Sequence, residues 1–366
     1  MERSNQLLNI VPKQKLREGY EISRIIKGGW QLAGDHGRVH KNRAVQDMIT
    51  FVDAGITTFD CADIYLGVEQ LIGKFLAELR RQRGEQSVKK VKIHTKYVPD
   101  RDSLTSLSFK DVEQIIDRSL CRLGQDRLEM VQFHWWDYSV PGHVEAISHL
   151  ETLRRKGKVN LIGATNFDSS YLRELGAEVD LASVQVQYSL LDSRASGDFA
   201  RIAAEQNISL LVYGVLAGGF LTDRWIGKID PGFMFENRSL VKYRLIIEDC
   251  GGWKLFQELL VTLRKIADQH KVDVATIAIR AILEDSKVAA IILGARYANR
   301  IPQTLKVFDI SLTDEDKLML EAIRKRQTPV RGNVYELERD TNGRHGKIMK
   351  YNLNKGDNSQ FRDTKT

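Results

Sequence analysis

Four side chains capable of acid–base chemistry follow apolar runs at separate points of the chain. Asp60 ends the run ITTFD, Tyr65 lies five residues further on, Lys96 follows VKIHT, and His134 follows EMVQF. A phenol titrates far above neutral pH unless a nearby cation stabilises the phenolate, and Lys96 can be that cation. If Asp60 pairs with Lys96 and His134 donates a hydrogen bond to a substrate oxygen or completes a proton relay, the group can protonate an oxygen while a hydride reaches its carbon.

The runs before these residues belong to a repeated alternation of strands and helices. Short β-branched segments alternate with amphipathic stretches, and the connections are short enough to require parallel strands covered by helices. Eight such units favour a closed α/β barrel, a (β/α)8 TIM barrel, in which strand C-termini build the site. The predicted strands are YEISRIIKGGW, ITTFD, VKIHTKYV, EMVQFHWW, VNLIGAT, ASVQVQYSL, ISLLVYGVL and VAAIILGA; the predicted helices include 42–54, 68–83, 109–123 (N-cap Ser108), 144–156, 199–206, 253–270 and 274–284.

Three segments fall outside this repeat. Residues 217–242 form a long loop after the seventh strand, which we expect to order over a bound cofactor. Residues 1 to about 20 are expected to form a cap or a strand at the barrel bottom. We predict one catalytic domain over residues 1–326 and a basic, polar C-terminal extension over 327–366, with its last ten or so residues disordered.

Composition narrows the class of protein. A hydrophobic fraction of 42% in 366 residues is enough for a large core. The net charge of +7 allows an anionic partner, but the basic residues are dispersed, so we expect neither nucleic-acid nor membrane binding. The three cysteines form no CxxC pair, which gives no sign of a metal site or a disulfide framework. No signal-like or membrane-spanning run is found, and we expect a cytoplasmic protein whose oligomeric state the sequence leaves open.

The segments FDCADIY, HTKY and VQFHWWDY resemble, in order, the Asp, Tyr, Lys and His tetrad of the aldo-keto reductase superfamily. The resemblance covers about residues 20–325. It implies an NADP-dependent enzyme that interconverts a small-molecule aldehyde or ketone and an alcohol by hydride transfer, with catalytic residues Asp60, Tyr65, Lys96 and His134.

The same resemblance extends to cofactor and substrate residues. GGWQL, GATNF, QVQYSLLD, VYGVLAGGFLT and ILGARYANRIPQTL resemble the family's cofactor-contacting segments, in the right order. No GxGxxG follows a strand, so NADPH or NADP+ would be held by these segments instead. Arginines suit the 2′-phosphate of NADPH, although Gln303-Thr304 replaces the family's usual Glu-Asn pair. The implied cofactor residues are Gly29, Trp30, Thr165, Asn166, Gln185, Tyr213, Gly214, Leu216, Gly218, Gly294, Ala295, Arg296, Arg300, Gln303 and Thr304; Trp30, Trp135 and Trp136 would contact substrate.

Other interpretations remain open at this stage. Taken singly, Asp60 reads as a helix-capping carboxylate and His134 as a core histidine; only the set of four favours catalysis. The barrel could serve as a cofactor-sensing regulatory subunit. Alternatively, Tyr65 could act in a non-redox elimination or isomerisation on the same site.

Overall fold

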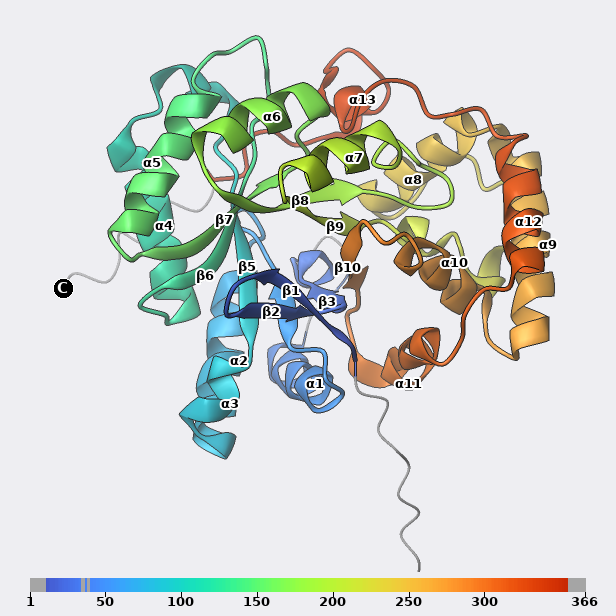
Figure 1. The fold of residues 1–366 in the computed structure, drawn as a ribbon, viewed down its shortest axis with the longest axis horizontal. Helices are drawn as coiled ribbons and strands as arrows, with labels where there is room; N and C mark the ends of the chain where they lie inside the picture. The colour runs from blue at the N-terminus through green and yellow to red at the C-terminus, as the bar shows by residue number, and fades with distance from the viewer. Residues whose placement is uncertain (1–10, 34–36, 38–39, 355–366) are drawn as a thin grey trace, which may run out of the picture.

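The computed structural model describes residues 11–33, 37 and 40–354. Its centre is a closed barrel of eight parallel strands in the order β10-β3-β4-β5-β6-β7-β8-β9 (Figure 1). The predicted TIM barrel is therefore confirmed. The barrel strands are β3 Ile25–Gly28, β4 Thr58–Asp60, β5 Lys92–Tyr97, β6 Leu128–Phe133, β7 Val159–Thr165, β8 Leu181–Gln187, β9 Ser209–Tyr213 and β10 Val288–Gly294.

The first predicted strand splits into two elements. β2 (Tyr20–Ser23) pairs antiparallel with β1 (Lys13–Arg17), and the chain joins the barrel only from Ile25. Tyr20 and Ile22 are buried in one apolar cluster with Met130 of β6 and Leu211 of β9. The hairpin therefore closes one end of the barrel, as expected for a cap at its bottom. Residues 1–10 lie outside the described part of the chain.

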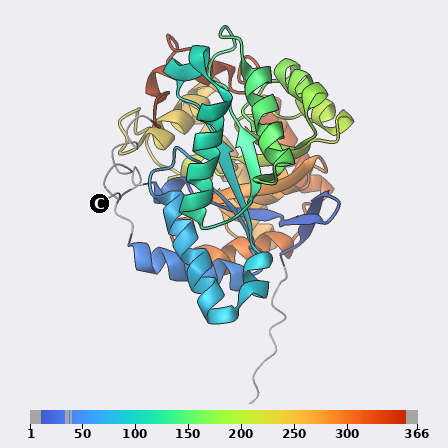
Figure 2. The same ribbon diagram turned by 90° about the vertical axis from the view of Figure 1, so that its left-hand side faces the viewer.

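Helices surround the strands. In Figure 2 the helices between about residues 70 and 180, coloured blue to green, stand around the barrel, and α1–α2, α2–α4, α4–α5 and α5–α6 are in contact. The helices are α1 Lys41–Asp53, α2 Val68–Arg83, α3 Glu85–Lys89, α4 Phe109–Leu123, α5 His143–Arg155, α6 Ser169–Glu178, α7 Asp198–Glu205, α8 Arg238–Asp249, α9 Gly252–His270, α10 Val274–Leu283, α11 Ile301–Leu305, α12 Asp314–Arg324 and α13 Glu336–Arg339.

Local sequence explains the ends of α4. The side chain of Ser108 accepts from the backbone N–H of Asp111, and the Asp111 carboxylate accepts from the N–H of Ser108. This capping box satisfies two N–H groups that the first helical turn leaves open. Gly124 ends the helix in the left-handed region, at φ 62°. The predicted N-cap at Ser108 and the bounds 109–123 are both confirmed.

The other two segments outside the repeat are folded where the structure describes them. Residues 217–242 contain the 3₁₀ turns Ala217–Gly219 and Asp223–Trp225 and the first residues of α8. Residues 328–354, which we call the C-terminal strap, include α13 and cross the upper side of the barrel in Figure 1, in red. The predicted disorder of the last ten or so residues falls largely outside the described chain.

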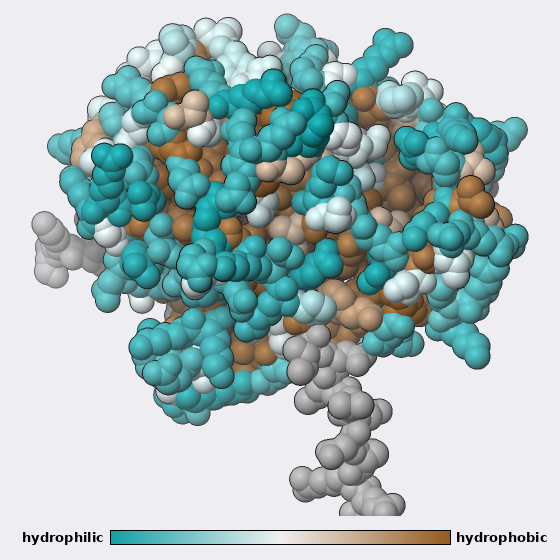
Figure 3. All heavy atoms as spheres, viewed as in Figure 1, coloured by the Kyte–Doolittle hydropathy of each residue, from teal (hydrophilic) through white to brown (hydrophobic). Residues whose placement is uncertain are grey.

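Hydrophilic residues cover most of the face shown in Figure 3, with apolar residues between them. Among the helices of the described residues, none combines the length and apolar character that crossing a membrane requires.

Candidate active site

Asp60 and Lys96 form a buried ion pair at the C-terminal ends of β4 and β5. Lys96 Nζ donates to Oδ1 and Oδ2 of Asp60, at 2.8 and 2.6 Å, and to the carbonyl of Cys61 at 2.7 Å. The side-chain amides of Gln132 and Gln185 donate to Asp60 Oδ1 at 3.0 and 2.6 Å. Both charged side chains are only 5% exposed, so these hydrogen bonds satisfy charges that water cannot reach.

Tyr65 lies beside this pair, on the loop after β4. Lys96 Nζ is 5.1 Å from the centre of its ring, and the indole of Trp30 is 4.9 Å away on a tilted plane. Burial, together with the negative charge of Asp60, raises the pKa of Tyr65 well above its usual value. The lowering of this pKa that was predicted from Lys96 is not found, because burial of the phenol has the largest effect and raises the pKa. Tyr65 therefore keeps its proton at neutral pH.

His134 follows β6 and is 2% exposed. Its Nδ1 lies 3.1 Å from the carbonyl oxygen of Thr165. A carbonyl can only accept, so Nδ1 carries the proton in this contact. Burial, with a further contribution from the charge of Arg339, lowers the pKa of His134 to about 3 and keeps the ring neutral. Within the part of the chain that the structure describes, Nε2 is buried without a hydrogen-bond partner. With the proton at Nδ1, Nε2 carries a lone pair and can accept a hydrogen bond, whereas the sequence predicts a donor.

The fold brings three of the four predicted residues to the ends of successive strands. β4, β5 and β6 are parallel neighbours, with Asp60 opposite His94 and Lys96 opposite Gln132. The rim therefore carries a carboxylate, an ammonium and an imidazole, with the phenol of Tyr65 on the loop above the first of them. This set can deliver a proton to an oxygen beside the ring of Tyr65.

The residues expected to hold a nicotinamide make contacts among themselves. The Tyr213 hydroxyl donates to Asn166 Oδ1 at 2.8 Å, and Thr165 Oγ1 donates to the carbonyl of Gln185. Asn166 adopts φ 62°, a conformation that asparagine tolerates better than most residues. The Gln185 side-chain amide donates to Asp60 Oδ1 at 2.6 Å.

The ring of Tyr213 is covered by side chains from two other segments. Lys242 Nζ of α8 lies 5.3 Å from the centre of the Tyr213 ring and 5.3 Å from that of Tyr335 in the C-terminal strap. Tyr243 packs against the turn after β9, where a Cβ added to Gly214 would lie 2.7 Å from the Tyr243 hydroxyl. A flat ring could stack on Tyr213 once the Lys242 side chain moves aside.

Arginines gather where the last strand ends. The Arg43 guanidinium of α1 lies 4.1 Å from the centre of the Tyr297 ring, and that of Arg296 lies 6.0 Å from it. Arg300 is exposed at the start of α11. The chain here forms short helical turns, with Pro302 in the first turn of α11. These guanidinium groups form a donor set that fits a phosphate.

The remaining predicted cofactor positions surround these two areas. Gly29 is required by close packing, because an added Cβ would lie 2.7 Å from the carbonyl of Asp60. At Gly294 an added Cβ would meet the side-chain nitrogen of Gln31 at 2.0 Å. The other positions are half-buried or exposed near the same rim: Leu216, Gly218, Ala295, Gln303 and Thr304.

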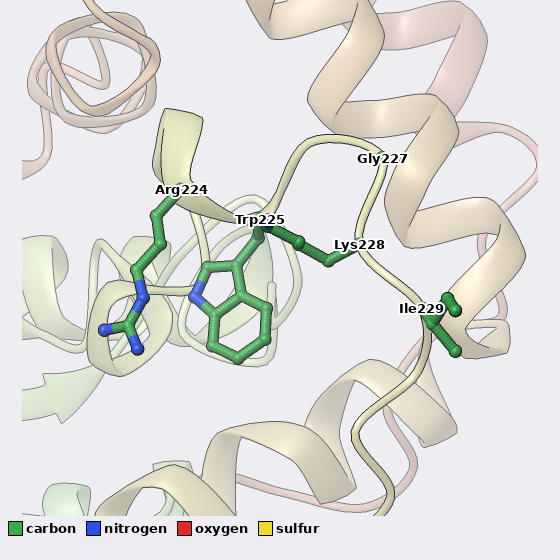
Figure 4. Close-up of a pocket in the computed structure, with 5 residues that line it drawn as sticks. All are labelled: Arg224, Trp225, Gly227, Lys228 and Ile229. Atoms are coloured by element: carbon green, nitrogen blue, oxygen red, sulfur yellow. The ribbon is translucent and has the colours of Figure 1, made fainter.

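The tryptophans separate into two groups. Trp136 packs edge-on against His134, with ring centres 4.3 Å apart, whereas the Trp135 ring packs against Phe133 and His143. Trp225 lies 4.7 Å from Phe220 and lines a shallow hollow with Arg224, Gly227, Lys228 and Ile229 (Figure 4). None of the four predicted catalytic residues lines that hollow.

The C-terminal strap supplies residues that sequence reasoning missed. The Tyr335 ring lies edge-on to His134, with centres 5.6 Å apart. Glu338 is fully buried and forms ion pairs with Lys242 and Arg194, each at 3.4 Å. Burial alone would raise the pKa of Glu338, but the charges of Lys242 and Arg194 outweigh it and lower the pKa to about 2. No regular spacing in the strap sequence marks these contacts.

A family model and two relatives with sequence similarity to this chain all describe reductases or oxidoreductases. The family model described as "Aldo/keto reductase family" matches residues 24–325. An NADH-specific methylglyoxal reductase of Escherichia coli (strain K12) is 24% identical over 82% of this chain and 94% of its own length. An uncharacterized oxidoreductase of Bacillus subtilis (strain 168), YrpG, is 28% identical over 84% of this chain and 94% of its own.

Other similar proteins differ in their described roles. A probable voltage-gated potassium channel subunit beta of Oryza sativa subsp. japonica is 25% identical over 84% of this chain and 94% of its own length. Among solved structures, a glycerol dehydrogenase from Gluconobacter oxydans superposes with a TM-score of 0.72 at 23% identity, over 88% of this chain and 97% of that one. This last likeness concerns the fold alone.

Proposed function

Because this chain belongs to the aldo/keto reductase family, we propose that it is an NADPH-dependent reductase of a small aldehyde or ketone, with Tyr65 as the proton donor. The observation that carries the proposal is the placement of the Tyr65 ring 5.1 Å from the ammonium of a buried Lys96–Asp60 pair, on the same rim as His134. When bound, the reduced nicotinamide supplies a hydride to the carbonyl carbon.

Tyr65 acts as the acid. Its raised pKa keeps the hydroxyl protonated, so it can give its proton to the oxygen that becomes negative as the carbon is reduced. The phenolate left behind lies near the Lys96 ammonium, whose charge stabilises it. Asp60 holds that ammonium in place through two short contacts. A protonated phenol suits reduction better than the reverse reaction, which needs a base.

His134 positions the oxygen after it has gained its proton. Its Nε2 is buried and has no hydrogen-bond partner among the described residues, so its lone pair can accept a hydrogen bond from the hydroxyl of an alcohol. The Thr165 carbonyl fixes the ring orientation through Nδ1. The neutral ring adds no positive charge to the site. His134 therefore binds the alcohol form of the substrate, and Tyr65 serves the carbonyl form.

The residues present fit a nicotinamide cofactor at two places. Tyr213 would support the nicotinamide ring, with Thr165 and Asn166 beside it, once Lys242 moves. Arg296 and Arg300 would bind the 2′-phosphate that distinguishes NADPH from NADH. The E. coli relative is described as NADH-specific, so the preference of this chain for NADPH over NADH is tested by measuring the dissociation constants of both nucleotides.

A regulatory role is the second candidate. The Oryza sativa relative is described as a probable potassium channel subunit beta, which allows a barrel of this family to serve a partner protein. In that case cofactor binding would persist while turnover stayed slow. A non-redox reaction on the same rim would instead form product without net consumption of NADPH.

Titration with NADPH and NADH, followed by tryptophan fluorescence, tests cofactor binding, since Trp30 lies in van der Waals range of Tyr65. A panel of aldehydes and ketones then tests reduction through loss of NADPH absorbance, with Tyr65→Phe as the matched control. We expect Tyr65→Phe to bind cofactor normally and to lose turnover by ~10²–10⁴-fold. Failure of both nucleotides to bind contradicts the proposed function, and full turnover by Tyr65→Phe contradicts the proton donor.

A further inference from the structure

Arg339 of the C-terminal strap is anchored beside the catalytic rim. Its Nη2 donates to the carbonyls of Trp135 and Asn166, at 3.1 and 2.7 Å. These two residues directly follow His134 and Thr165, which are themselves joined through His134 Nδ1. Tyr335 lies near both His134 and Arg339: its ring centre is 5.6 Å from that of the His134 imidazole and 5.4 Å from Arg339 Cζ. The strap therefore brings a guanidinium next to the histidine of the site.

The guanidinium is held but incompletely satisfied. Tyr138 stacks on it, with its ring centre 4.0 Å from Cζ. Nε and Nη1 of Arg339 are buried and lack hydrogen-bond partners, and within residues 11–33, 37 and 40–354 no carboxylate forms an ion pair with it. Buried charges in proteins are normally paired, because an unpaired one loses its hydration without compensation. An anion is the group that this position lacks.

The neighbouring charges do not fill that gap. Glu338, one residue before Arg339, is committed to Arg194 and Lys242. Asp137, on the loop after β6, pairs with Arg101 and accepts from the Ser139 hydroxyl. Asp168 caps α6 by accepting from the N–H groups of Ser170 and Tyr171. Among the residues that the structure describes, Nε and Nη1 of Arg339 and Nε2 of His134 thus lack hydrogen-bond partners at this corner of the rim.

We propose that Arg339 is a substrate-binding residue that selects carbonyl compounds bearing a carboxylate, such as semialdehydes and oxo acids. The carboxylate pairs with the guanidinium, and the carbonyl lies toward Tyr65 and His134. This assignment rests on the proposed reductase function and narrows its substrate class. Because Arg339 donates to the carbonyl of Trp135, the residue after His134, only a short spacer, such as a few carbons or one aromatic ring, separates the two ends of the substrate.

Two matched aldehydes test the proposal: 4-carboxybenzaldehyde and its methyl ester, which differ in charge but have the same reacting group. We expect the wild-type protein to prefer the acid, chiefly through a lower KM. Arg339→Gln should raise KM for the acid about 10- to 100-fold more than KM for the ester, since a hydrogen-bonded charge contact is lost only for the acid. Arg339→Lys keeps the charge and should restore part of the preference.

Arg344→Gln is the matched control, because Arg344 lies on the same strap and pairs with Asp249. It should leave the preference intact. Equal losses for both aldehydes in Arg339→Gln, with a lowered melting temperature, would mean that Arg339 only anchors the strap, and the proposal would fall. A wild-type protein that shows no preference for the acid also overturns it.

A binding measurement separates this proposal from the proposed function. The protein is mixed with nucleotide, and the rise in its melting temperature on adding each aldehyde is measured. A ligand that binds the folded protein raises this temperature without any turnover. If the acid stabilises the wild-type protein but not Arg339→Gln, and neither aldehyde is reduced, the carboxylate site is supported and the reductase function is contradicted. Reduction of the ester without any better binding of the acid supports the reductase and overturns the carboxylate site.

Discussion

Lys242 Nζ lies 3.4 Å from a carboxylate oxygen of Glu338, and this ion pair joins α8 to the C-terminal strap over the ring of Tyr213. Lys242 is largely buried, and burial lowers its pKa despite the attraction of Glu338. The pair closes the rim at the position where a nicotinamide would stack. If a nicotinamide stacks on Tyr213 as proposed, its binding is coupled to the strap through the side chain of Lys242.

Replacing Lys242 by methionine should strengthen binding of the nucleotide. Methionine keeps the length of the side chain but removes the ammonium that lies over Tyr213. The oxidised nicotinamide is itself cationic, so we expect NADP+ to gain more than NADPH, by about tenfold, as a nearby like charge is lost. Dissociation constants from fluorescence titration check this. Weaker binding of both forms would show that Lys242 contacts the cofactor instead of competing with it.

Glu338 should make the stability of the protein depend on acid pH. Its pKa is about 2 in the folded protein, below the ordinary value of 4.5, so the folded state favours the carboxylate. The stabilisation is complete above about pH 4.5 and is lost as the pH falls toward 2. Denaturant unfolding of Glu338→Gln should show a deficit at pH 7 that narrows as the pH falls. A deficit that stays constant with pH would contradict this assignment.

Variants of the Asp60–Lys96 pair should affect the stability of the protein and its turnover differently. Asp60→Asn leaves the Lys96 ammonium buried without a full charge partner, and we expect a loss of ~3–5 kcal/mol in the free energy of unfolding. The double variant Asp60→Asn/Lys96→Met removes both charges and should recover much of that stability. Turnover should stay low in both variants, because the single variant removes the carboxylate that holds Lys96 in place and the double variant removes the ammonium itself. Recovered turnover in the double variant would exclude Lys96 from catalysis.

Arg300→Ala tests the choice of cofactor. We expect NADPH to bind about 10- to 100-fold more weakly and NADH to change little, because only NADPH carries the 2′-phosphate. Arg324→Ala is the control, since Arg324 is an arginine of α12 paired with Glu321. Equal losses for both nucleotides would remove the phosphate assignment from Arg300.

Much of the architecture could be predicted because it depends on local patterns. Helix bounds 68–83 and 109–123 match α2 and α4, since amphipathic spacing and the Ser108 cap act within one element. Among the described residues, the helices outside the predicted helical ranges are α3, α6, α8, α11, α12 and α13. The first strand is shorter than expected because residues 20–23 pair with β1, a contact that no periodicity within the run reveals.

The sequence by itself determined the barrel and the order in which its strands are followed by Asp60, Tyr65, Lys96 and His134. The alternation of strands with helices, and the residue at which each strand ends, depend on residues that are neighbours in the sequence. Only the tertiary structure decided that Lys96 gives its hydrogen bonds to Asp60 and Cys61, that Thr165 fixes the proton of His134 at Nδ1, and that Tyr335 and Arg339 cover the rim. The reason is physical: burial and pairing between segments up to about two hundred residues apart set charge, protonation and access, and no local pattern encodes them.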